Sequence, residues 1–195
     1  MSEAALTKAK ESAALWLSDA RANRFFRYGL MIAVAVIFLD QLSKYLIVHV
    51  VELPEQLRPC AKNPAQVCGQ IAVSPIFDLT YVENRGASFG LGAGGLASRI
   101  ILSLISTGVA AGLIFWLGRL ARPVAVAGVG LIIGGALGNL YDRIAYGYVV
   151  DFLDFSGLWF PWVFNVADTA INVGIGLLLL DAWLTRDQAD SGKKA

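Results

Sequence analysis

Four long apolar segments constrain this chain more than any other feature. A bilayer core about 30 Å thick is crossed by roughly 20 mainly apolar helical residues. Segments that meet this need are residues 28–51, 100–117, 124–140 and 166–183. Hydrophobic residues make up 56% of the chain, which is more than a soluble core of this size requires. The sequence therefore predicts an all-α membrane protein with four transmembrane helices.

The two ends of the chain are more polar than the middle. Residues 1–27 set Leu15 and Trp16 among Lys8, Lys10 and other charged residues. This composition is typical of a basic amphipathic helix on a membrane surface, and a disordered tail is the alternative that the sequence leaves open. We expect residues 28–185 to form the membrane domain and residues 186–195 to form a polar tail.

Basic residues gather at three places, and their positions predict the orientation in the membrane. They precede the first segment, fill the short turn between the second and third segments, and follow the last one: Lys8, Lys10, Arg21, Arg24, Arg27, Arg119, Arg122, Arg186, Lys193 and Lys194. Loops rich in Lys and Arg stay in the cytoplasm. Both termini should therefore be cytoplasmic, and the connections 52–99 and 141–165 should face outward.

Glycines recur at every fourth position on two of the apolar segments. They are Gly130, Gly134 and Gly138 on the third segment, and Gly108 and Gly112 on the second. This spacing places small residues along one helix face, where two backbones can approach closely. We expect both sets to be helix-packing seams.

Charged and amide side chains interrupt the apolar segments. A charge inside a membrane helix costs roughly 3 kcal/mol, so such a group is expected to have a partner or a function. Asp40 and Lys44 are four residues apart with the acid first, which favours an ion pair, while a role in substrate binding stays open. Asn139, Asp142 and Arg143 gather at the end of the third segment. We expect Arg143 to restrain at least one acid.

Asp151 and Asp168 have no basic neighbour in the sequence. Asp151 lies in the last connection, and Asp168 shares one side of a helical turn with Asn165 at the start of the last segment. Two carboxylates in a poorly hydrated site cannot both ionise easily, so one keeps a proton while the other acts as a base. That division suits amide hydrolysis. Ion-coupled transporters also keep acids in the membrane, and a non-catalytic scaffold is a further alternative.

Composition and residue counts exclude several other functions. The 16 basic residues nearly balance the 15 acidic ones, so the sequence predicts no nucleic-acid partner. His49 is the only histidine, which excludes a zinc site built on two or three imidazoles. Cys60 and Cys68 would form a disulfide if their loop is extracytoplasmic, and would otherwise be two inert thiols.

Five short motifs occur in order along the four segments. They are "DQLSK" (40–44), "NRGASFG" (84–90), "GGALGNLYDR" (134–143), "VVDF" (149–152) and "FNVAD" (164–168). Together they resemble the motifs of the lipoprotein signal peptidases, also called signal peptidase II. The resemblance runs from about residue 28 to residue 183. Residues 59–70 look like an insertion outside these motifs.

This resemblance implies a function and a set of site residues. Proteins of the family are bacterial aspartic endopeptidases that remove signal peptides from prolipoproteins, cutting just before a cysteine that carries diacylglycerol. The resemblance implies that Asp151 and Asp168 are the catalytic pair. The residues that would shape the site or bind substrate are Asp40, Lys44, Asn84, Gly86, Asn139, Asp142, Arg143 and Asn165.

The resemblance also implies the setting in which the protein works. The expected fold is four membrane helices with a small extracytoplasmic β-element formed by the first outer loop. The expected partners are diacylglyceryl prolipoproteins and membrane lipids, and neither a metal ion nor a cofactor is required. We expect a monomer in the bacterial inner membrane, with its active site near the extracytoplasmic face.

Overall fold

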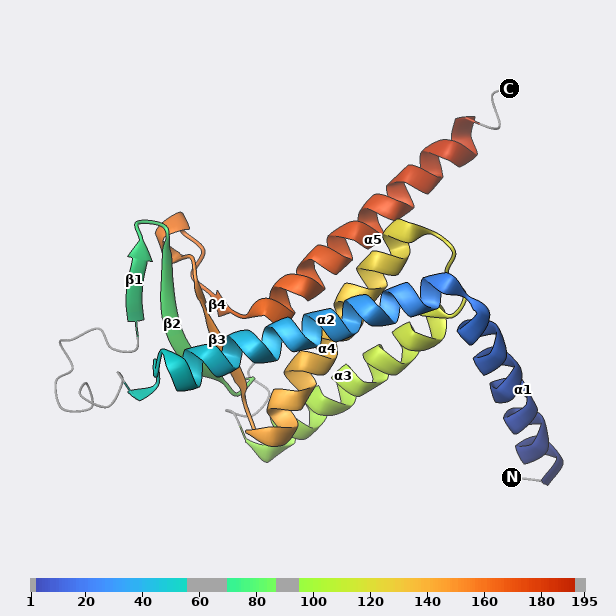
Figure 1. Ribbon diagram of the computed structural model, residues 1–195, viewed down its shortest axis with the longest axis horizontal. Coiled ribbons are helices and arrows are strands. Elements are labelled where there is room, and N and C mark those ends of the chain that lie inside the picture. Colours follow the sequence, from blue (N-terminus) through green and yellow to red (C-terminus); the bar gives the residue numbers. More distant parts are fainter. Residues whose placement is uncertain (1–2, 56–69, 87–94, 192–195) are drawn as a thin grey trace.

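We describe the computed structural model of the chain over residues 3–55, 70–86 and 95–191. Long helices cross one another at the centre of the molecule, and a small sheet lies at one end (Figure 1). In chain order the elements are α1 (Glu3–Ala22), α2 (Arg24–Tyr45), the π-helical turn η1 (Leu46–Val50), β1 (Gln70–Ser74), β2 (Phe77–Asn84), α3 (Leu96–Leu117), α4 (Pro123–Ala145), β3 (Val149–Asp154), the 3-10 turn η4 (Ser156–Leu158), β4 (Val163–Phe164) and α5 (Val166–Ser191).

Four helical segments are long and apolar enough to cross a membrane, as the sequence predicts. They are Arg24–Val50, Leu96–Leu117, Pro123–Ala145 and Val166–Arg186. The first, third and fourth extend beyond the apolar windows, because helices continue into the polar boundary of the bilayer. The second begins four residues before its window, at Leu96. The prediction of four membrane helices is confirmed.

Helix α4 is the central helix, and glycines let its neighbours approach it closely. A Cβ added at Gly130 would lie 2.7 Å from the carbonyl oxygen of Gly29, and one at Gly134 would lie 2.6 Å from Cβ of Val36. Both contacts are with α2, so the predicted seam on this helix is confirmed. The seam predicted on α3 is wrong: a Cβ at Gly108 or Gly112 would meet nothing within 4 Å.

The sheet is antiparallel and has the strand order β1-β2-β3-β4. Only β1 and β2 come from the first outer connection, whereas β3 and β4 come from the connection between α4 and α5. The first outer connection therefore contributes to the β-element as expected, and the last connection supplies its other two strands. The register pairs Asn84 with Val149 and Val82 with Asp151, which brings the end of β2 beside Asp151. Apolar side chains of η1 and β3, among them Ile47 and Phe152, pack together and connect the sheet to the end of α2.

Residues 3–22 form the helix α1. The ring of Trp16 stacks on Phe115 with centroids 5.4 Å apart and meets Phe26 edge-on at 6.0 Å. Asn23, at the junction of α1 and α2, donates its amide to the carbonyl oxygens of Gly118 and Leu120 at 3.2 and 3.0 Å. These contacts attach α1 to the turn between α3 and α4.

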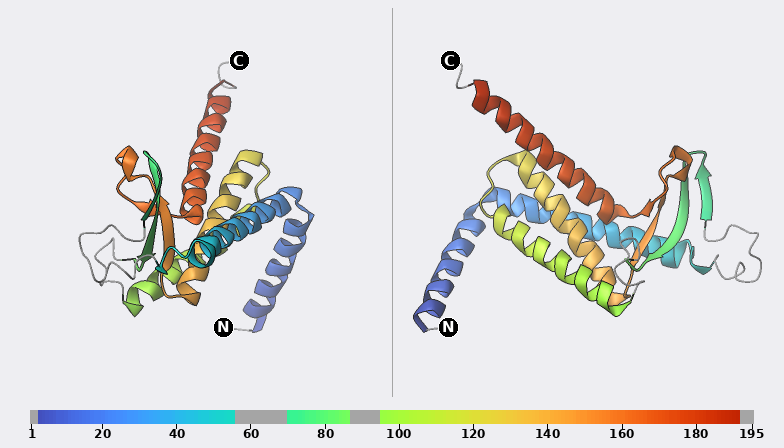
Figure 2. Two further views of the ribbon diagram at one scale, coloured as in Figure 1. Left: turned by 60° about the vertical axis from the view of Figure 1, so that its left-hand side comes forward. Right: turned by 180° about the vertical axis from the view of Figure 1, so that it is seen from behind.

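The two views in Figure 2 agree that the sheet lies at one end of the helices and that α1 and the last turn of α5 lie toward the other. An ion pair of 2.9 Å between Arg122 and Asp181 joins α4 and α5 at that far end. Asp181 is therefore remote from the sheet, as its position in the sequence predicts. Cys60, Cys68 and nearly all of the 59–70 segment lie outside the described residues.

Candidate active site

Asp151 is a buried acid on the central strand pair of the sheet. Its side chain is 1% exposed. Asn84, at the end of β2, donates its side-chain amide to Oδ2 of Asp151 at 3.0 Å. Asn165 donates its amide to Oδ1 of the same carboxyl at 2.7 Å. Two neutral amides, one from each side, therefore fix the orientation of this carboxyl.

Gly86 fixes the orientation of the side-chain amide of Asn84. Its backbone N–H donates to Oδ1 of Asn84 at 2.9 Å, which turns the amide nitrogen toward Asp151. The backbone of Gly86 has φ = +77°, a region that side chains disfavour. An added Cβ would also lie 2.6 Å from Leu102 of α3. Gly86 therefore provides a tight turn that positions Asn84.

Asp168 lies in the first turn of α5, where Asn165 is the N-cap residue. Oδ1 of Asn165 accepts the backbone N–H of Asp168 at 2.8 Å, and Oδ2 of Asp168 accepts the backbone N–H of Asn165 at 3.4 Å. This is the reciprocal pattern of a capping box. The half-buried Asp168 thus lies at the N-terminal end of the helix dipole, a position where acidic residues are favoured.

Two asparagines connect the two acids. Asn165 donates to Asp151, as above, and also donates to Oδ1 of Asn139 at 3.1 Å. Asn139 in turn donates its own amide to Oδ1 of Asp168 at 2.7 Å. Asp151 and Asp168 thus belong to one hydrogen-bonded cluster, although they come from a strand and a helix. That the two acids act as a catalytic pair stays a prediction.

Burial raises the pKa of Asp151 from its usual 3.8 to about 7, and the negative charge of Asp168 acts in the same direction. The hydrogen bonds that Asn84 and Asn165 donate to the carboxylate oppose this rise in the pKa. Near neutral pH the cluster can hold a proton on Asp151 beside an ionised partner. Such a pair can act as an acid and a base in one reaction.

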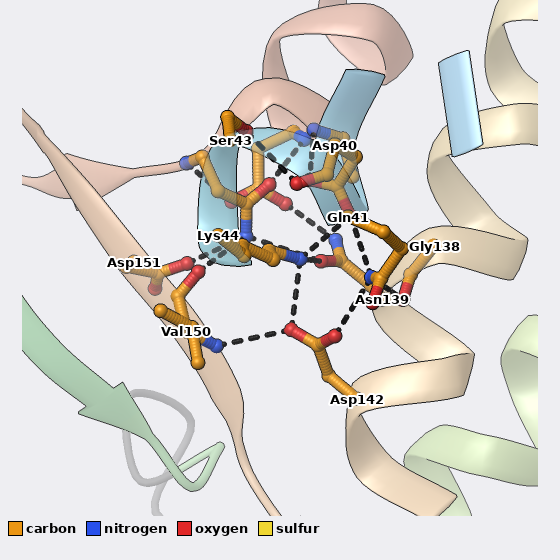
Figure 3. A network of polar contacts seen from close by, with 12 residues as sticks. Asp40, Gln41, Ser43, Lys44, Gly138, Asn139, Asp142, Val150 and Asp151 are labelled. Atoms are coloured by element: carbon orange, nitrogen blue, oxygen red, sulfur yellow. Dashed lines mark hydrogen bonds and ion pairs between the residues drawn. The ribbon is translucent and has the colours of Figure 1, made fainter. Parts of the chain in front are cut away.

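A second cluster, built on the buried residues Asp40, Lys44 and Asp142, lies close to Val150 and Asp151 (Figure 3). Lys44 of α2 forms ion pairs of 2.8 Å with Oδ2 of Asp40 and 2.8 Å with Oδ2 of Asp142. The ion pair expected between Asp40 and Lys44 is present, and Asp142 is a second partner that the spacing did not indicate. Nζ of Lys44 also approaches Oδ1 of Asn139 at 3.4 Å, so this cluster adjoins the first one.

Each acid of this cluster holds the backbone next to one of the site acids. Oδ1 of Asp40 accepts the N–H of Ala167 at 3.0 Å, and Ala167 directly precedes Asp168. Oδ2 of Asp142 accepts the N–H of Val150 at 3.1 Å, and Val150 directly precedes Asp151. Lys44 therefore links the two peptide groups that set the positions of Asp151 and Asp168.

Gln41 belongs to the same cluster and was missed in the sequence. Its amide nitrogen donates to Oδ1 of Asp142 at 2.9 Å and to Oδ2 of Asp40 at 3.1 Å. The only signal was its place between Asp40 and Lys44 on the same turn of the helix. Gly138 makes room for this contact, because an added Cβ would lie 2.8 Å from Oδ2 of Asp40.

Arg143 lies close enough to the acids to attract them, and the role expected for it stays a prediction. Its guanidinium donates to the carbonyl oxygen of Asn139 at 3.3 Å, and it acts on Asp168 and Asp151 through electrostatic attraction. The third acid of the connection, Asp154, accepts Oγ1 of Thr80 at 2.6 Å and the N–H of Ser156 at 2.9 Å. These bonds join β3 to β2 and to η4, so Asp154 has a structural environment separate from the pair.

The surface beside Asp151 is hollowed. A cavity of about 340 Å³ lies between the end of β2 and the segment that leads into β4, and Asp151 lies in its wall. The other residues that line it are Val82, Glu83, Asn84, Arg85, Pro161, Trp162 and Val163. Asp151 therefore borders this cavity, although it is almost fully buried.

Comparison with known proteins identifies the family. The model of the family described as "Signal peptidase (SPase) II" matches residues 32–184. A lipoprotein signal peptidase of Caulobacter vibrioides is 45% identical over 157 residues, which are 80% of this chain and 86% of that protein. One of Syntrophotalea carbinolica is 44% identical over 162 residues, covering 81% and 92% of the two chains.

Solved structures give the same result for the fold. A bacterial membrane enzyme solved by the in meso method at 2.3 Å resolution is similar with a TM-score of 0.63 and 25% identity, covering 84% of this chain and 90% of that one. A second, solved at 1.9 Å, has a TM-score of 0.62 and 27% identity over 80% and 92% of the two chains. The chain belongs to the signal peptidase II family.

Proposed function

We propose that this protease of the membrane cleaves diacylglyceryl prolipoproteins just before the lipidated cysteine, with Asp151 and Asp168 as its catalytic pair. The observation that carries the proposal is the hydrogen-bonded link from Asp151 through Asn165 and Asn139 to Asp168. The transporter alternative has no support, because the matching family and relatives are peptidases. The family membership itself implies a prolipoprotein substrate.

The surroundings of the two acids support different roles. Asp151 is buried and has a pKa of about 7, so it is the acid that holds the shared proton. Asp168 is less buried, lies at a helix N-terminus, and accepts hydrogen bonds from Asn139 and from the backbone of Asn165. Asp168 is therefore the base and Asp151 the acid in the first step.

In that step the Asp168 carboxylate takes a proton from a water molecule, whose oxygen attacks the scissile carbonyl carbon. Asp151 donates its proton to the carbonyl oxygen, which yields a neutral tetrahedral gem-diol. In the second step Asp168 gives its proton to the amide nitrogen and Asp151 takes one back from a hydroxyl. The C–N bond then breaks, leaving a carboxyl on the signal peptide and an amine on the cysteine.

Access from the membrane supports a lipidated substrate. The cavity beside Asp151 is bordered by Trp162, which is 64% exposed, and Trp159 in the same connection is 96% exposed. Tryptophans gather at the boundary between lipid and water. The scissile peptide would occupy the cavity at this boundary, while the acyl chains of the cysteine remain in lipid.

The orientation in the membrane is part of the proposal. Basic residues of α1 and of the turn between α3 and α4 lie together, because Asn23 and Trp16 attach α1 to that turn. The positive-inside rule assigns this end, with residues 1–27 and 186–195, to the cytoplasm. The sheet and both acids would then lie at the extracytoplasmic face.

A cleavage assay with one matched control tests the catalytic pair. Purified protein in detergent is given a synthetic prolipopeptide with a diacylglyceryl cysteine. Asp151→Asn and Asp168→Asn should each lower kcat by about a thousandfold, because each removes a proton-transfer group. Asp154→Asn, on the same strand, should cleave at close to the wild-type rate. Normal cleavage by either of the first two variants would overturn the catalytic pair.

The substrate class is tested separately with the same peptide lacking its acyl chains. The proposal predicts that this peptide is cleaved at least about tenfold less efficiently, because its only anchor in the bilayer is lost. Equal kcat/KM for the two peptides would be consistent with protease activity but would exclude recognition of the lipid.

A further inference from the structure

A second cavity, of about 330 Å³, lies beside the sheet at the ends of α2 and α4. Its lining is rich in aromatic rings: Gln41, Lys44, Tyr45, Val48, His49, Tyr81, Tyr141, Tyr146, Tyr148 and Val150. Val150 lines this cavity and Asp151 lines the one described above, and successive side chains of a strand point to opposite faces. The two cavities therefore lie on opposite sides of β3.

The rings form two walls. On one side Tyr141 meets Tyr146 at a centroid distance of 6.3 Å, and Tyr146 meets Tyr148 at 6.2 Å. The hydroxyl of Tyr148 pairs with that of Tyr81 at 3.4 Å, which extends this wall onto β2. On the other side the ring of His49 lies 4.8 Å from that of Tyr45, both near the end of α2.

Tyrosine rings attract cations, because the π-face of the ring carries partial negative charge. Tyr148 already shows this property: the guanidinium of Arg85 lies over its ring at 5.4 Å from the centroid. Burial raises the pKa of Tyr81, and also that of Tyr146, above the usual value of 10, so both phenols stay neutral at physiological pH. Neutral phenols add hydrogen-bonding groups without repelling an anion that accompanies the cation.

Beneath the lining of the cavity lies the buried cluster of Lys44, Asp40 and Asp142, in which acids outnumber bases. Lys44 lines the cavity but is bound at 2.8 Å to both Asp40 and Asp142, so this buried cluster holds one base and two acids. Figure 3 shows Lys44 lying between α2 and the strand that carries Val150, with its nitrogen directed toward Asp142. A cation in the cavity would meet aromatic faces above a site of net negative formal charge.

The depth of the cavity matches a lipid headgroup. Tyr45 and Tyr141 lie within a turn or so of the ends of the spans Arg24–Val50 and Pro123–Ala145, where the helices leave the bilayer. Tyr45, Tyr141 and Tyr146 are 57%, 52% and 54% exposed, so the aromatic walls are open to the surroundings. At this level the surroundings are phospholipid headgroups.

We propose that this tyrosine-lined cavity binds the ammonium group of a zwitterionic phospholipid, on the side of the sheet opposite the catalytic pair. The bound lipid joins the end of α2 to the end of α4 and to β2. It thereby stabilises the packing of the sheet against the helices. This site is independent of the proposed cleavage reaction, and its test does not use substrate.

The test compares lipids that differ only in their headgroup. The purified full chain in detergent is titrated with phosphatidylethanolamine and with phosphatidylglycerol of the same acyl chains, and binding is followed by native mass spectrometry and by Tm. The ethanolamine lipid should bind about tenfold more tightly and raise the Tm more, because only it carries a cation. Equal binding of the two lipids would overturn the proposal.

Two sets of variants locate the site. The double substitution Tyr141→Leu with Tyr146→Leu should abolish the preference for the ethanolamine lipid. Tyr28→Leu is the matched control, because Tyr28 is also 52% exposed and lies on α2 near the opposite end. It should keep the full preference. A preference that survives the double substitution, or that disappears in the control, would exclude this cavity as the site.

A third arm separates a membrane lipid from a free amine. O-Phosphoethanolamine supplies the same headgroup without acyl chains. The proposal predicts that it binds far more weakly than the lipid, because the acyl chains hold the headgroup at this depth. Binding as strong as that of the lipid would assign the cavity to a soluble amine and overturn a lipid as its occupant.

Discussion

Asn165 donates a 2.7 Å hydrogen bond to Asp151 while its own side-chain oxygen accepts the backbone N–H of Asp168 at 2.8 Å. One amide thus orients the buried acid and caps the helix that carries the other. The direction of this amide is fixed, because only its nitrogen can donate to a carboxylate and only its oxygen can accept from the backbone. The two proposed catalytic groups are therefore connected through the smallest possible number of side chains.

The first prediction concerns this amide. Asn165→Leu keeps the approximate shape but removes every side-chain hydrogen bond of Asn165, including those to Asp151, Asn139 and the backbone of Asp168. The kcat should fall about a hundredfold, because the two acids lose their common support. Loss of a donor to the carboxylate should raise the pKa of Asp151 further, and the alkaline limb of the pH profile should move to higher pH. A purely structural role would leave that limb in place.

Asn172→Leu is the control for this substitution. Asn172 is exposed on the same helix and donates only to the carbonyl oxygen of Asp168, at 3.0 Å. Its replacement should change neither kcat nor the pH profile appreciably. An unshifted profile in Asn165→Leu would contradict the proposed link to Asp151.

The second prediction concerns pH. The pKa of Asp151 is raised to about 7, and the proposed first step needs this carboxyl protonated. The kcat should therefore decline as the pH rises through about 7, with one proton lost. The measurement is a kcat profile on the lipidated peptide, with Asp154→Asn as the control that should keep the same limb. A rate that stays level up to pH 9 would exclude Asp151 as the acid.

The same shift has a consequence for stability. Between the usual value of 3.8 and about 7 the folded chain holds more proton at Asp151 than the unfolded chain does. The contribution of this group to stability is present below that window and is lost as the pH rises through it. Asp151→Asn should therefore gain Tm relative to the wild type as the pH increases from 4 to 8. A constant Tm difference across this range would contradict a raised pKa.

The third prediction concerns the buried lysine. Lys44→Met leaves Asp40 and Asp142 without their counter-charge, and breaking a buried pair costs about 3–5 kcal/mol. The expected result is a large loss of Tm in detergent. Arg85→Met is the control, because its ion pair with Glu83 is formed by exposed side chains and should contribute little. Equal losses of Tm in the two variants would show that the buried cluster contributes no more to stability than the exposed ion pair does.

The fourth prediction uses two glycines that the sequence treats alike. Gly138→Ala would place a Cβ 2.8 Å from Oδ2 of Asp40, and the forced displacement should cost about 1–3 kcal/mol. Gly108→Ala meets nothing within 4 Å and should leave the Tm unchanged or slightly raised. Thermal unfolding of the two variants checks the difference. A stable Gly138→Ala protein would mean that Asp40 can move without loss.

The spans were predictable because a long apolar window is a strong signal that needs no tertiary information. The choice of Asp151 and Asp168 as a pair came from the resemblance of the motifs to the signal peptidase II family, because the spacing of the acids alone left that choice open. Strand β3 could not be recognised from its residue pattern. It is buried over nearly its whole length, so the alternation of polar and apolar residues that marks a half-exposed strand is absent.

Hydrogen bonds between side chains and the backbone could not be predicted from the sequence. Asp40 binds the N–H of Ala167, and Asp142 binds that of Val150, but every residue except proline offers such a group. Gln41 was missed for a related reason, because an amide beside an acid and a lysine has no pattern of its own. The glycine spacing of α3 shows the opposite error: the same four-residue repeat can face lipid.

Helix α2 supplies no proposed catalytic group. Asp40 and Lys44 nevertheless connect it to α5, which carries Asp168, and through Asp142 to β3, which carries Asp151. If this helix slides along the membrane normal, as a bilayer of different thickness would make it do, it carries α5 and β3 with it. The depth of the centre would change while its internal spacing is retained. The enzyme is in this sense built to tolerate membranes of unequal thickness without losing its alignment.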